Sequence, residues 1–438
     1  MTTPLPRQLT FQDFEFGLFC HFGPNTFLDQ EWGTGAEDPA VVNPTEFNPR
    51  QWARAAREAG MRYFVFTAKH HDGFCNWPTD ATDHCIKASP YQGGKGDLVE
   101  QVAEAARAEG LALGLYLSPW DRHDPRYPDP VAYDEVYLAQ WRELLTRYGP
   151  LCCCWLDGAG SEGRVYDWPR IIGQIRELQP EACVFSMGEP DYRWIGNEDG
   201  LAPDPTWNVI PRPQDYLNHD QFFTRPFLES FPHWMPAECD ARIRANWFWN
   251  TYDLPTLKST ERLVDLYYKS VGHGCNLLLN LGPDTRGLLP EPDVARLGEM
   301  GAEIRRRFAV PVAQASQPAS AFAAAGQAVA EVTGAVMAAP DGSSAAERAA
   351  TESLELTFAA PTPINHMILQ EDIAQGDRVR EYIVQVLTQG RWEGVYVGTA
   401  IGHKQMDQFP TIAAEAVRVH FRQSEGEPKL KSLAAYCV

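Results

Sequence analysis

The segment RQWARAAREAGMRYFVFTAK, residues 50–69, decides the fold because it joins an amphipathic helix to an apolar strand. Asn48 and Pro49 precede the helix and Gly60 ends it, as expected of residues that start and stop helices. The strand, residues 63–69, is apolar along its length rather than alternating, which indicates burial on both faces. Strands of this kind belong to parallel sheets that helices cover on the outside.

The same pairing of helix and strand recurs, with a period of about 40 residues, as far as residue 310. This repeat gives roughly eight strands and predicts a (β/α)8-like TIM barrel over residues 1–310. A doubly wound open sheet is the alternative, and it is disfavoured because no glycine-rich phosphate turn follows the first strand. Strands are expected at residues 16–22, 63–69, 111–118, 151–158, 182–187, 233–239 and 276–282.

The composition changes at Pro311. Residues 311–350 are rich in alanine, serine and glycine, which predicts a linker and the start of a second domain. Residues 351–438 then contain short apolar runs between turn residues, the pattern of an all-β sandwich. We therefore expect an α/β catalytic domain followed by a C-terminal β-sandwich.

Charge and hydropathy exclude several classes of partner. The 438-residue chain has a net charge of −20, which disfavours binding to nucleic acid or to an anionic membrane surface. No apolar run approaches the roughly 20 residues of a membrane span. The N-terminus shows no export signal, so a cytoplasmic location is expected, with a periplasmic or secreted one open if a signal peptide has been removed. The ten cysteines include no CxxC pair and are expected to be reduced thiols, most of them buried.

Polar and aromatic side chains gather where the predicted strands end. In parallel barrels these ends form the active face. Two carboxylates from different strands, surrounded by histidine and tryptophan, fit the acid–base chemistry of glycoside hydrolysis. The strand ends and the loops after them carry His21, His70, His71, Asp72, Tyr116, Trp120, Trp155, Asp157, Glu198 and Glu238.

Other interpretations of these residues stay open. Asp157 precedes Gly158 and could be a turn carboxylate, and Glu238 could be a structural ion-pair partner. A Zn²⁺ site built from His21, the two adjacent histidines and an aspartate is a second alternative. It is disfavoured because adjacent side chains on a strand point to opposite faces. A carbohydrate-binding protein without activity is a third, and the presence of two candidate carboxylates argues against it.

Several motifs resemble one known family. The stretches FGLFCHFG, EWGTG, AKHHDGF, LYLSPWD and WLDGA, in that order, resemble the α-L-fucosidases of glycoside hydrolase family 29. The resemblance runs from about Phe14 to about Arg307. The later stretch from Pro363, PINHMILQEDIAQGDRVREYIVQV, resembles the discoidin-like (galactose-binding-like) β-sandwich that these enzymes carry.

The resemblance implies a retaining exo-fucosidase that needs neither metal nor cofactor and acts on a fucosylated oligosaccharide or glycoconjugate. Asp157, the aspartate of the W-x-D-G motif, would be the nucleophile. Glu238 and Trp247 would touch the sugar that bears the fucose. The residues implied to bind fucose are His21, Glu31, Trp32, His70, His71, Tyr116 and Trp155.

The acid/base is harder to place because its position varies within the family. The stretch RWIGNEDGLAPDPTWNV, residues 193–209, resembles the branch that prefers α1,3/1,4-linked fucose, whose G-N-E glutamate points to Glu198. Glu189 and Asp199 remain rivals. In other branches an arginine precedes the acid/base by about a dozen residues, and Ser186 stands there in this chain. The C-terminal module lacks the usual tryptophan, so a structural role is expected for it rather than sugar binding.

Overall fold

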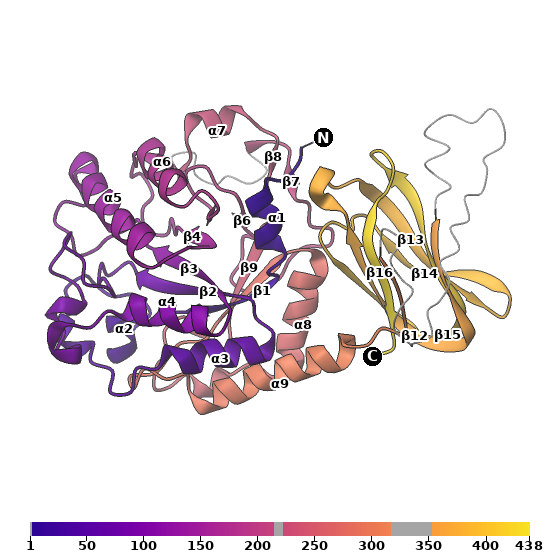
Figure 1. Ribbon diagram of the computed structural model, residues 1–438, viewed down its shortest axis with the longest axis horizontal. Coiled ribbons are helices and arrows are strands. Elements are labelled where there is room, and N and C mark those ends of the chain that lie inside the picture. The colour runs from indigo at the N-terminus through magenta and orange to yellow at the C-terminus, as the bar shows by residue number, and fades with distance from the viewer. Residues whose placement is uncertain (1, 214–221, 317–352) are drawn as a thin grey trace.

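The chain forms a parallel sheet surrounded by helices and, C-terminal to it, an antiparallel sheet (Figure 1). The computed structural model describes residues 2–213, 222–316 and 353–438. The predicted linker at 311–350 therefore lies largely outside the described residues. Its first part, β11 (Ala313–Ser316), pairs with the C-terminal sheet.

The parallel sheet has eight strands in the order β5-β4-β3-β2-β1-β10-β9-β6. Every neighbouring pair in it is parallel. The two edge strands approach each other, because Phe185 directly after β5 forms an isolated parallel bridge with Tyr192 directly before β6. The strands are β1 (Phe16–Cys20), β2 (Tyr63–Lys69), β3 (Ala112–Leu117), β4 (Cys153–Trp155), β5 (Cys183–Val184), β6 (Arg193–Trp194), β9 (Ala237–Arg242) and β10 (Asn276–Asn280).

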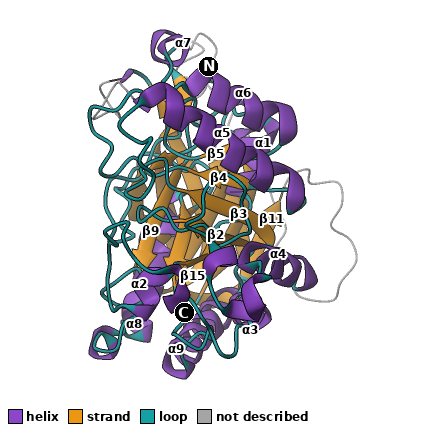
Figure 2. Ribbon diagram, turned by 90° about the vertical axis from the view of Figure 1, so that its left-hand side faces the viewer, coloured by secondary structure: helices purple, strands orange, loops and turns teal. Residues whose placement is uncertain are grey.

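Helices lie outside these strands, and long loops run along one side of the molecule (Figure 2). No helix separates β5 from β6. The connection from β6 to β9 contains β7 (Val209–Ile210), α7 (Arg225–Glu229) and β8 (His233–Trp234). The remaining helices are α1 (Pro6–Gln12), α2 (Pro24–Phe27), α3 (Pro49–Ala59), α4 (Leu98–Ala108), α5 (Pro130–Arg147), α6 (Trp168–Leu178), α8 (Thr260–Ser270) and α9 (Glu291–Phe308).

The helix boundaries follow the signals in the sequence. The Asn48 side chain accepts a hydrogen bond from the amide of Gln51, and Gly60 ends α3 in the left-handed conformation with φ of 98°. The Asp97 side chain caps α4 in the same way. The predicted start and stop of α3 are confirmed.

The sixth predicted strand was misplaced. Residues 233–239 contain β8 and only the beginning of β9, which runs on to Arg242. Glu238 therefore lies near the N-terminal end of its strand and not after it. The predicted strand from Ala182 to Met187 is also shorter than expected, since the chain leaves the sheet after Val184.

The C-terminal residues are all-β, as predicted, and their six strands belong to one antiparallel sheet in the order β11-β16-β12-β15-β13-β14. The long strands β12 and β15 change register in two places, between Thr357 and Thr362 and between Ile364 and His366. The sheet has its own hydrophobic cluster, to which β12, β13 and β15 contribute most. The further strands are β12 (Ser353–Glu371), β13 (Val379–Thr388), β14 (Arg391–Gly398), β15 (Gln405–Ser424) and β16 (Leu430–Tyr436).

Two more observations bear on the expectations from composition. Across the described residues, none of the helices has the length and apolar character needed to cross a membrane. All ten cysteines are free thiols, and Cys437 is the exposed one among them.

Candidate active site

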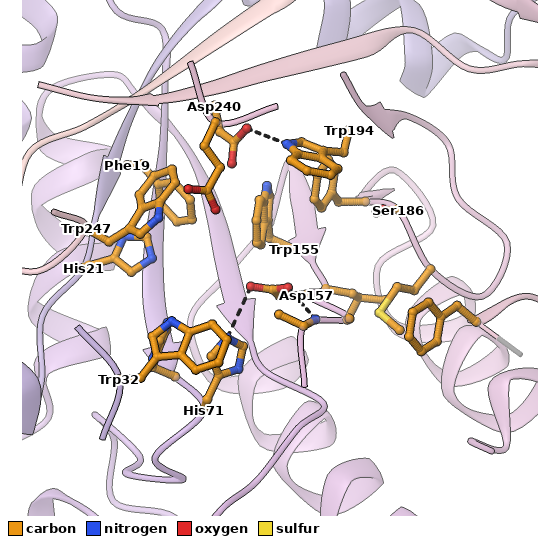
Figure 3. A pocket seen from close by; sticks show the side chains of 18 of the residues that line it. Phe19, His21, Trp32, His71, Trp155, Asp157, Ser186, Trp194, Asp240 and Trp247 are labelled. Carbon is orange, nitrogen blue, oxygen red and sulfur yellow. Dashed lines mark hydrogen bonds and ion pairs between the residues drawn. The ribbon is translucent and has the colours of Figure 1, made fainter. Parts of the chain in front are cut away.

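A cavity of about 330 Å³ opens at the carboxyl ends of the parallel strands (Figure 3). Asp157 lies at one side of it and Asp240 at the other, with the ring of Trp155 between them (Figure 3). The cavity is lined by Phe19, His21, Trp32, His70, His71, Trp155, Leu156, Asp157, Gly158, Ala159, Glu162, Phe185, Ser186, Met187, Trp194, Glu198, Phe222, Phe223, Asp240 and Trp247.

Asp157 follows β4, and its carboxylate accepts three contacts. Oδ2 accepts from the Tyr116 hydroxyl at 3.0 Å and lies 3.5 Å from Nε2 of His71, and Oδ1 accepts from the Ala159 amide at 2.9 Å. Burial pushes the pKa of Asp157 upward, but the contacts from His71, Ala159 and Tyr116 outweigh it and hold the pKa below the ordinary 3.8. Asp157 is therefore an anion at neutral pH, with 28% of its side chain still accessible from the cavity.

A short relay orients His71 toward this carboxylate. The Ser118 hydroxyl donates to the carbonyl oxygen of Trp120 at 2.7 Å, so it accepts from Nδ1–H of His71, also at 2.7 Å. Nε2 of His71 then faces Asp157. With Nδ1–H already bound to Ser118, a hydrogen bond from His71 to the Asp157 carboxylate needs a second proton, on Nε2.

His21 and His70 are buried beside the cavity as neutral rings. Burial lowers the pKa of His21 to about 3 and that of His70 well below its usual range. Nδ1 of His21 donates to Oδ1 of Asn280 at 2.8 Å, because the amide group of Asn280 donates to the carbonyl of Trp247. Nε2 of His21 is thus an acceptor, which suits a sugar hydroxyl.

Aromatic rings form most of the remaining wall. Trp155 stacks on Phe185 with ring centroids 4.3 Å apart, and the ring of Trp247 lies 5.1 Å from that of His21. Trp32 packs edge-on against His71 at 5.3 Å and keeps 48% exposure at the rim. A wall of this composition offers apolar faces beside a few polar groups, as sugar-binding cavities require.

Glu198 lines the same cavity as Asp157 but is more exposed, with 47% of its side chain accessible. Its Oε2 lies 3.3 Å from the guanidinium of Arg242, which itself packs over the ring of Trp247 at 5.1 Å. Because Ser186 stands where other branches of the family carry an arginine, no arginine contact was expected for Glu198. The structure supplies one from the end of β9 instead.

Three expected ligands, Glu31, Tyr116 and Glu238, lie outside the cavity lining. Glu238 is buried beneath the cavity, where Oε1 accepts from the indole of Trp155 at 2.9 Å and Oε2 from the Tyr63 hydroxyl at 2.7 Å. The carboxylate of Glu31 accepts from the backbone amides of Trp247 and Phe248. Both carboxylates hold residues of the wall in place, and burial raises the pKa of each. Tyr116 is also buried and reaches the cavity only through its bond to Asp157.

Asp240 is a cavity residue that the sequence analysis missed. It is 4% exposed, its Oδ1 accepts from the indole of Trp194 at 2.7 Å, and burial raises its pKa well above the ordinary value. The signal was present in AECDAR, because Glu238, Asp240 and Arg242 alternate along β9 and so share one face. Each of the three contacts a different residue of the cavity, namely Trp155, Trp194 and Glu198.

The rivals for the acid role lie elsewhere. Glu189 accepts a hydrogen bond from the Thr224 hydroxyl at 2.8 Å and is not part of the lining. Asp199 is exposed and forms a backbone bridge with Ala241. Glu162, which was not considered, does line the cavity and is exposed. The histidines do not assemble as a metal site, since the described ranges contain no group of three or more candidate ligands that could hold an ion.

An ionised aspartate, a second carboxylate, neutral histidines and aromatic walls, set at the carboxyl ends of a curled parallel sheet, define a glycoside hydrolase. Comparison with known proteins then specifies the family. The family profile described as α-L-fucosidase matches residues 3–306. α-L-Fucosidase 1 of Arabidopsis thaliana is 36% identical over 446 residues, which cover 99% of this chain and 87% of that protein.

Comparison with solved structures indicates the same family. SpGH29 has a TM-score of 0.86 at 33% identity and covers 99% of this chain and 98% of its own. The Ruminococcus gnavus GH29 fucosidase E1_10125, solved in complex with fucose, has a TM-score of 0.83 at 27% identity, with 99% and 95% coverage. The chain belongs to the α-L-fucosidase family, glycoside hydrolase family 29.

Proposed function

We propose that this enzyme is a retaining exo-α-L-fucosidase that removes terminal fucose from glycans by double displacement. The observation that carries the proposal is the ionised Asp157 in one cavity with the exposed carboxylate of Glu198. The bridge between the edge strands at Phe185 and Tyr192 supports the (β/α)8-like barrel, and the register shifts of the C-terminal sheet support the sandwich.

Asp157 is the nucleophile in this proposal. Its carboxylate attacks the anomeric carbon of fucose, and a covalent fucosyl-enzyme forms as the glycosidic bond breaks. The hydrogen bonds from Tyr116 and the Ala159 amide keep the carboxylate ionised and fix its direction. His71 supplies positive or hydrogen-bonding character next to the same oxygen.

Glu198 is the acid/base. It donates a proton to the leaving oxygen in the first step and takes a proton from water in the second, so that fucose leaves with its original configuration. Its ion-pair partner Arg242 holds the carboxyl group at the cavity, with Oε2 of Glu198 3.3 Å from the guanidinium.

The cavity size fits removal of one terminal sugar. Small-molecule cavities range from about 300 to 1,000 Å³, and the volume here, about 330 Å³, is near the lower end. The neutral acceptor of His21 suits a fucose hydroxyl, and the aromatic wall suits the 6-methyl group. The preference for α1,3/1,4 linkages rests on the resemblance of the segment around Glu198.

Replacing Asp157 with glycine tests the nucleophile. We expect activity on an aryl fucoside to fall by roughly 10³-fold or more and to return with added azide, giving fucosyl azide. No rescue in a folded variant would overturn the assignment. Proton NMR of the wild-type reaction should show α-L-fucose as the first product, and β-L-fucose first would refute retention.

Replacing Glu198 with alanine tests the acid/base. General acid catalysis contributes about 10²–10⁴-fold, so poor leaving groups should lose most of their rate while activated aryl fucosides lose little in the first step. Glu189→Ala is the matched control because that residue lies outside the cavity lining. An equal loss on both substrates would move the role to another carboxylate, with Glu162 the first to examine.

Linkage preference is tested by turnover of matched glycans. Lewis-type trisaccharides, which carry α1,3- or α1,4-linked fucose, should be hydrolysed faster than an α1,2-fucosylated glycan at equal concentration. Faster turnover of the α1,2-linked glycan would contradict the preference while leaving the fucosidase assignment intact.

A further inference from the structure

The segment that carries Glu198 continues into a loop that the C-terminal domain holds. The turn around Glu198 is closed locally, since Asn197 Oδ1 accepts from the amides of Asp199 and Leu201 at 3.1 and 3.2 Å. Downstream of this turn, residues 204–208 lead to β7, which lies on the side of the parallel sheet nearest the C-terminal sheet (Figure 1).

Asn208 is the best-held residue of this loop. Its side-chain amide donates to both carboxylate oxygens of Asp377 at 3.1 and 3.2 Å, and its backbone amide donates to Oδ2 of the same residue at 3.4 Å. The side-chain oxygen of Asn208 accepts from Gln12 of α1 at 3.0 Å. Asn208 and Asp377 are each 4% exposed, so little water competes for these bonds.

Two further contacts from the C-terminal domain reach the same loop. The Tyr396 hydroxyl donates to Oδ2 of Asp204 at 3.0 Å. The guanidinium of Arg380 lies over the ring of Trp207 at 4.9 Å, where it can make a cation–π contact. Three residues of the C-terminal domain thus hold three of the five residues from 204 to 208.

We infer that the C-terminal domain positions the acid/base. Asp377, Arg380 and Tyr396 are positioning residues that fix the downstream end of the Glu198 segment, so that Glu198 stands at the leaving oxygen. This inference rests on the proposed role of Glu198. It assigns the domain a part in catalysis without sugar binding, consistent with the absence of the tryptophan expected of a sugar-binding module.

Leaving-group dependence distinguishes this role from simple stabilisation. A displaced acid/base slows substrates that need protonation and leaves activated aryl fucosides nearly unaffected, and displacement by about 1 Å can cost up to about 10²-fold. Loss of stability alone lowers both rates by the same factor. We therefore compare kcat/KM for a Lewis-type trisaccharide with kcat/KM for an activated aryl fucoside.

Asp377→Ala should lower the trisaccharide value about tenfold or more and the aryl value by less than about threefold. Asp377→Asn keeps an acceptor for the Asn208 amide. Its ratio of the two kcat/KM values should therefore lie close to that of the wild type. The matched control is His366→Phe, which removes a buried bond between the domains, from the Tyr268 hydroxyl at 3.0 Å, without touching residues 204–208.

An unchanged ratio in folded Asp377→Ala would overturn the inference. If that variant fails to fold, Tyr396→Phe removes only the hydroxyl that donates to Asp204 and accepts from Gln405 at 3.4 Å. An unchanged ratio there counts equally against the inference. Glu198→Ala is measured beside them. If it shows the leaving-group effect and the C-terminal variants do not, the inference fails while the proposed function stands. If Glu198→Ala shows no effect, the acid/base assignment itself fails.

Discussion

The indole nitrogen of Trp155 donates a hydrogen bond to the carboxyl group of Glu238 over 2.9 Å, beneath the cavity. Trp155 is part of the cavity wall, whereas Glu238 is buried outside it. Glu238 therefore fixes the orientation of a wall residue without reaching the cavity itself. The second oxygen of Glu238 accepts from Tyr63, so the carboxyl group is fully used inside the sheet.

Replacing Glu238 should therefore affect stability and activity together. Glu238→Gln keeps an acceptor for Trp155 and should retain activity within a few-fold of the wild type. Glu238→Leu leaves the donors of Trp155 and Tyr63 unpaired in the interior, at a cost of about 1–3 kcal/mol each in unfolding free energy. Urea denaturation compares the two variants, and equal stability would refute this account.

The same residue predicts how stability depends on pH. Burial raises the pKa of Glu238 from 4.5 to about 7, so the folded protein holds this proton more tightly than the unfolded chain. Its contribution to stability is complete below about pH 4.5 and is lost as the pH rises through 7. Between pH 4.5 and 8, the midpoint temperature of thermal unfolding should fall less steeply for Glu238→Gln than for the wild type. Parallel curves would contradict the prediction.

His71 should set the acid limit of activity. As the proposed nucleophile, Asp157 must be ionised to attack, and its lowered pKa keeps it ionised into the acid range. In His71→Asn less opposes the effect of burial on the pKa of Asp157, so the acid limb of the profile should move to higher pH. The pH profile with an activated aryl fucoside measures it. Ser118→Ala, which removes the partner of His71 and not His71 itself, should give a smaller shift of the same sign.

We expect Asp240 to tolerate replacement by asparagine but not by alanine. Burial raises the pKa of the Asp240 carboxyl group well above its ordinary value and so favours the neutral form, and a neutral amide has nearly the same shape. Asp240→Asn should keep the bond from Trp194 and lose little activity. Asp240→Ala should cost about 1–3 kcal/mol in stability and lower kcat/KM. A loss in Asp240→Asn as large as in Asp240→Ala would show that the carboxyl group itself takes part in the reaction.

Lys69 carries a buried charge that its partners must neutralise. Its ammonium group donates to Asp121 at 3.1 Å, to the Tyr133 hydroxyl at 2.8 Å and to Gln140 at 3.0 Å, and it is fully buried. Lys69→Met leaves Asp121 as an uncompensated charge, which typically costs about 3–5 kcal/mol. The double variant with Asp121→Asn should recover part of that loss in denaturation experiments, and strictly additive losses would argue against the pair.

The helices and the longer strands could be predicted from the sequence because their signals are local. Asn48, Pro49 and Gly60 mark α3 through capping and backbone preference, which need no knowledge of the rest of the chain. The short strands β5 and β6 could not be delimited in this way. Their bounds depend on where Phe185 and Tyr192 meet across the sheet, which is a contact and not a pattern.

The site was predictable where a residue follows an apolar strand and not where it lies within a polar one. His21, His70 and Asp157 follow strands that are mostly apolar and buried along their length, and all three line the cavity. Asp240 and Arg242 escaped notice because β9 carries alternating charges on its inner face, so it does not read as a buried strand. The roles of these residues stay predictions until the variants are measured.

The cysteine pattern has a practical consequence for studying this enzyme. Nine thiols are buried or half-buried, and Cys437 is exposed just after β16, in the C-terminal domain. A maleimide dye should therefore react first at Cys437, far in sequence from Asp157 and Glu198. The wild-type protein thus offers, without added cysteines, a preferred attachment point for a fluorophore or a solid support.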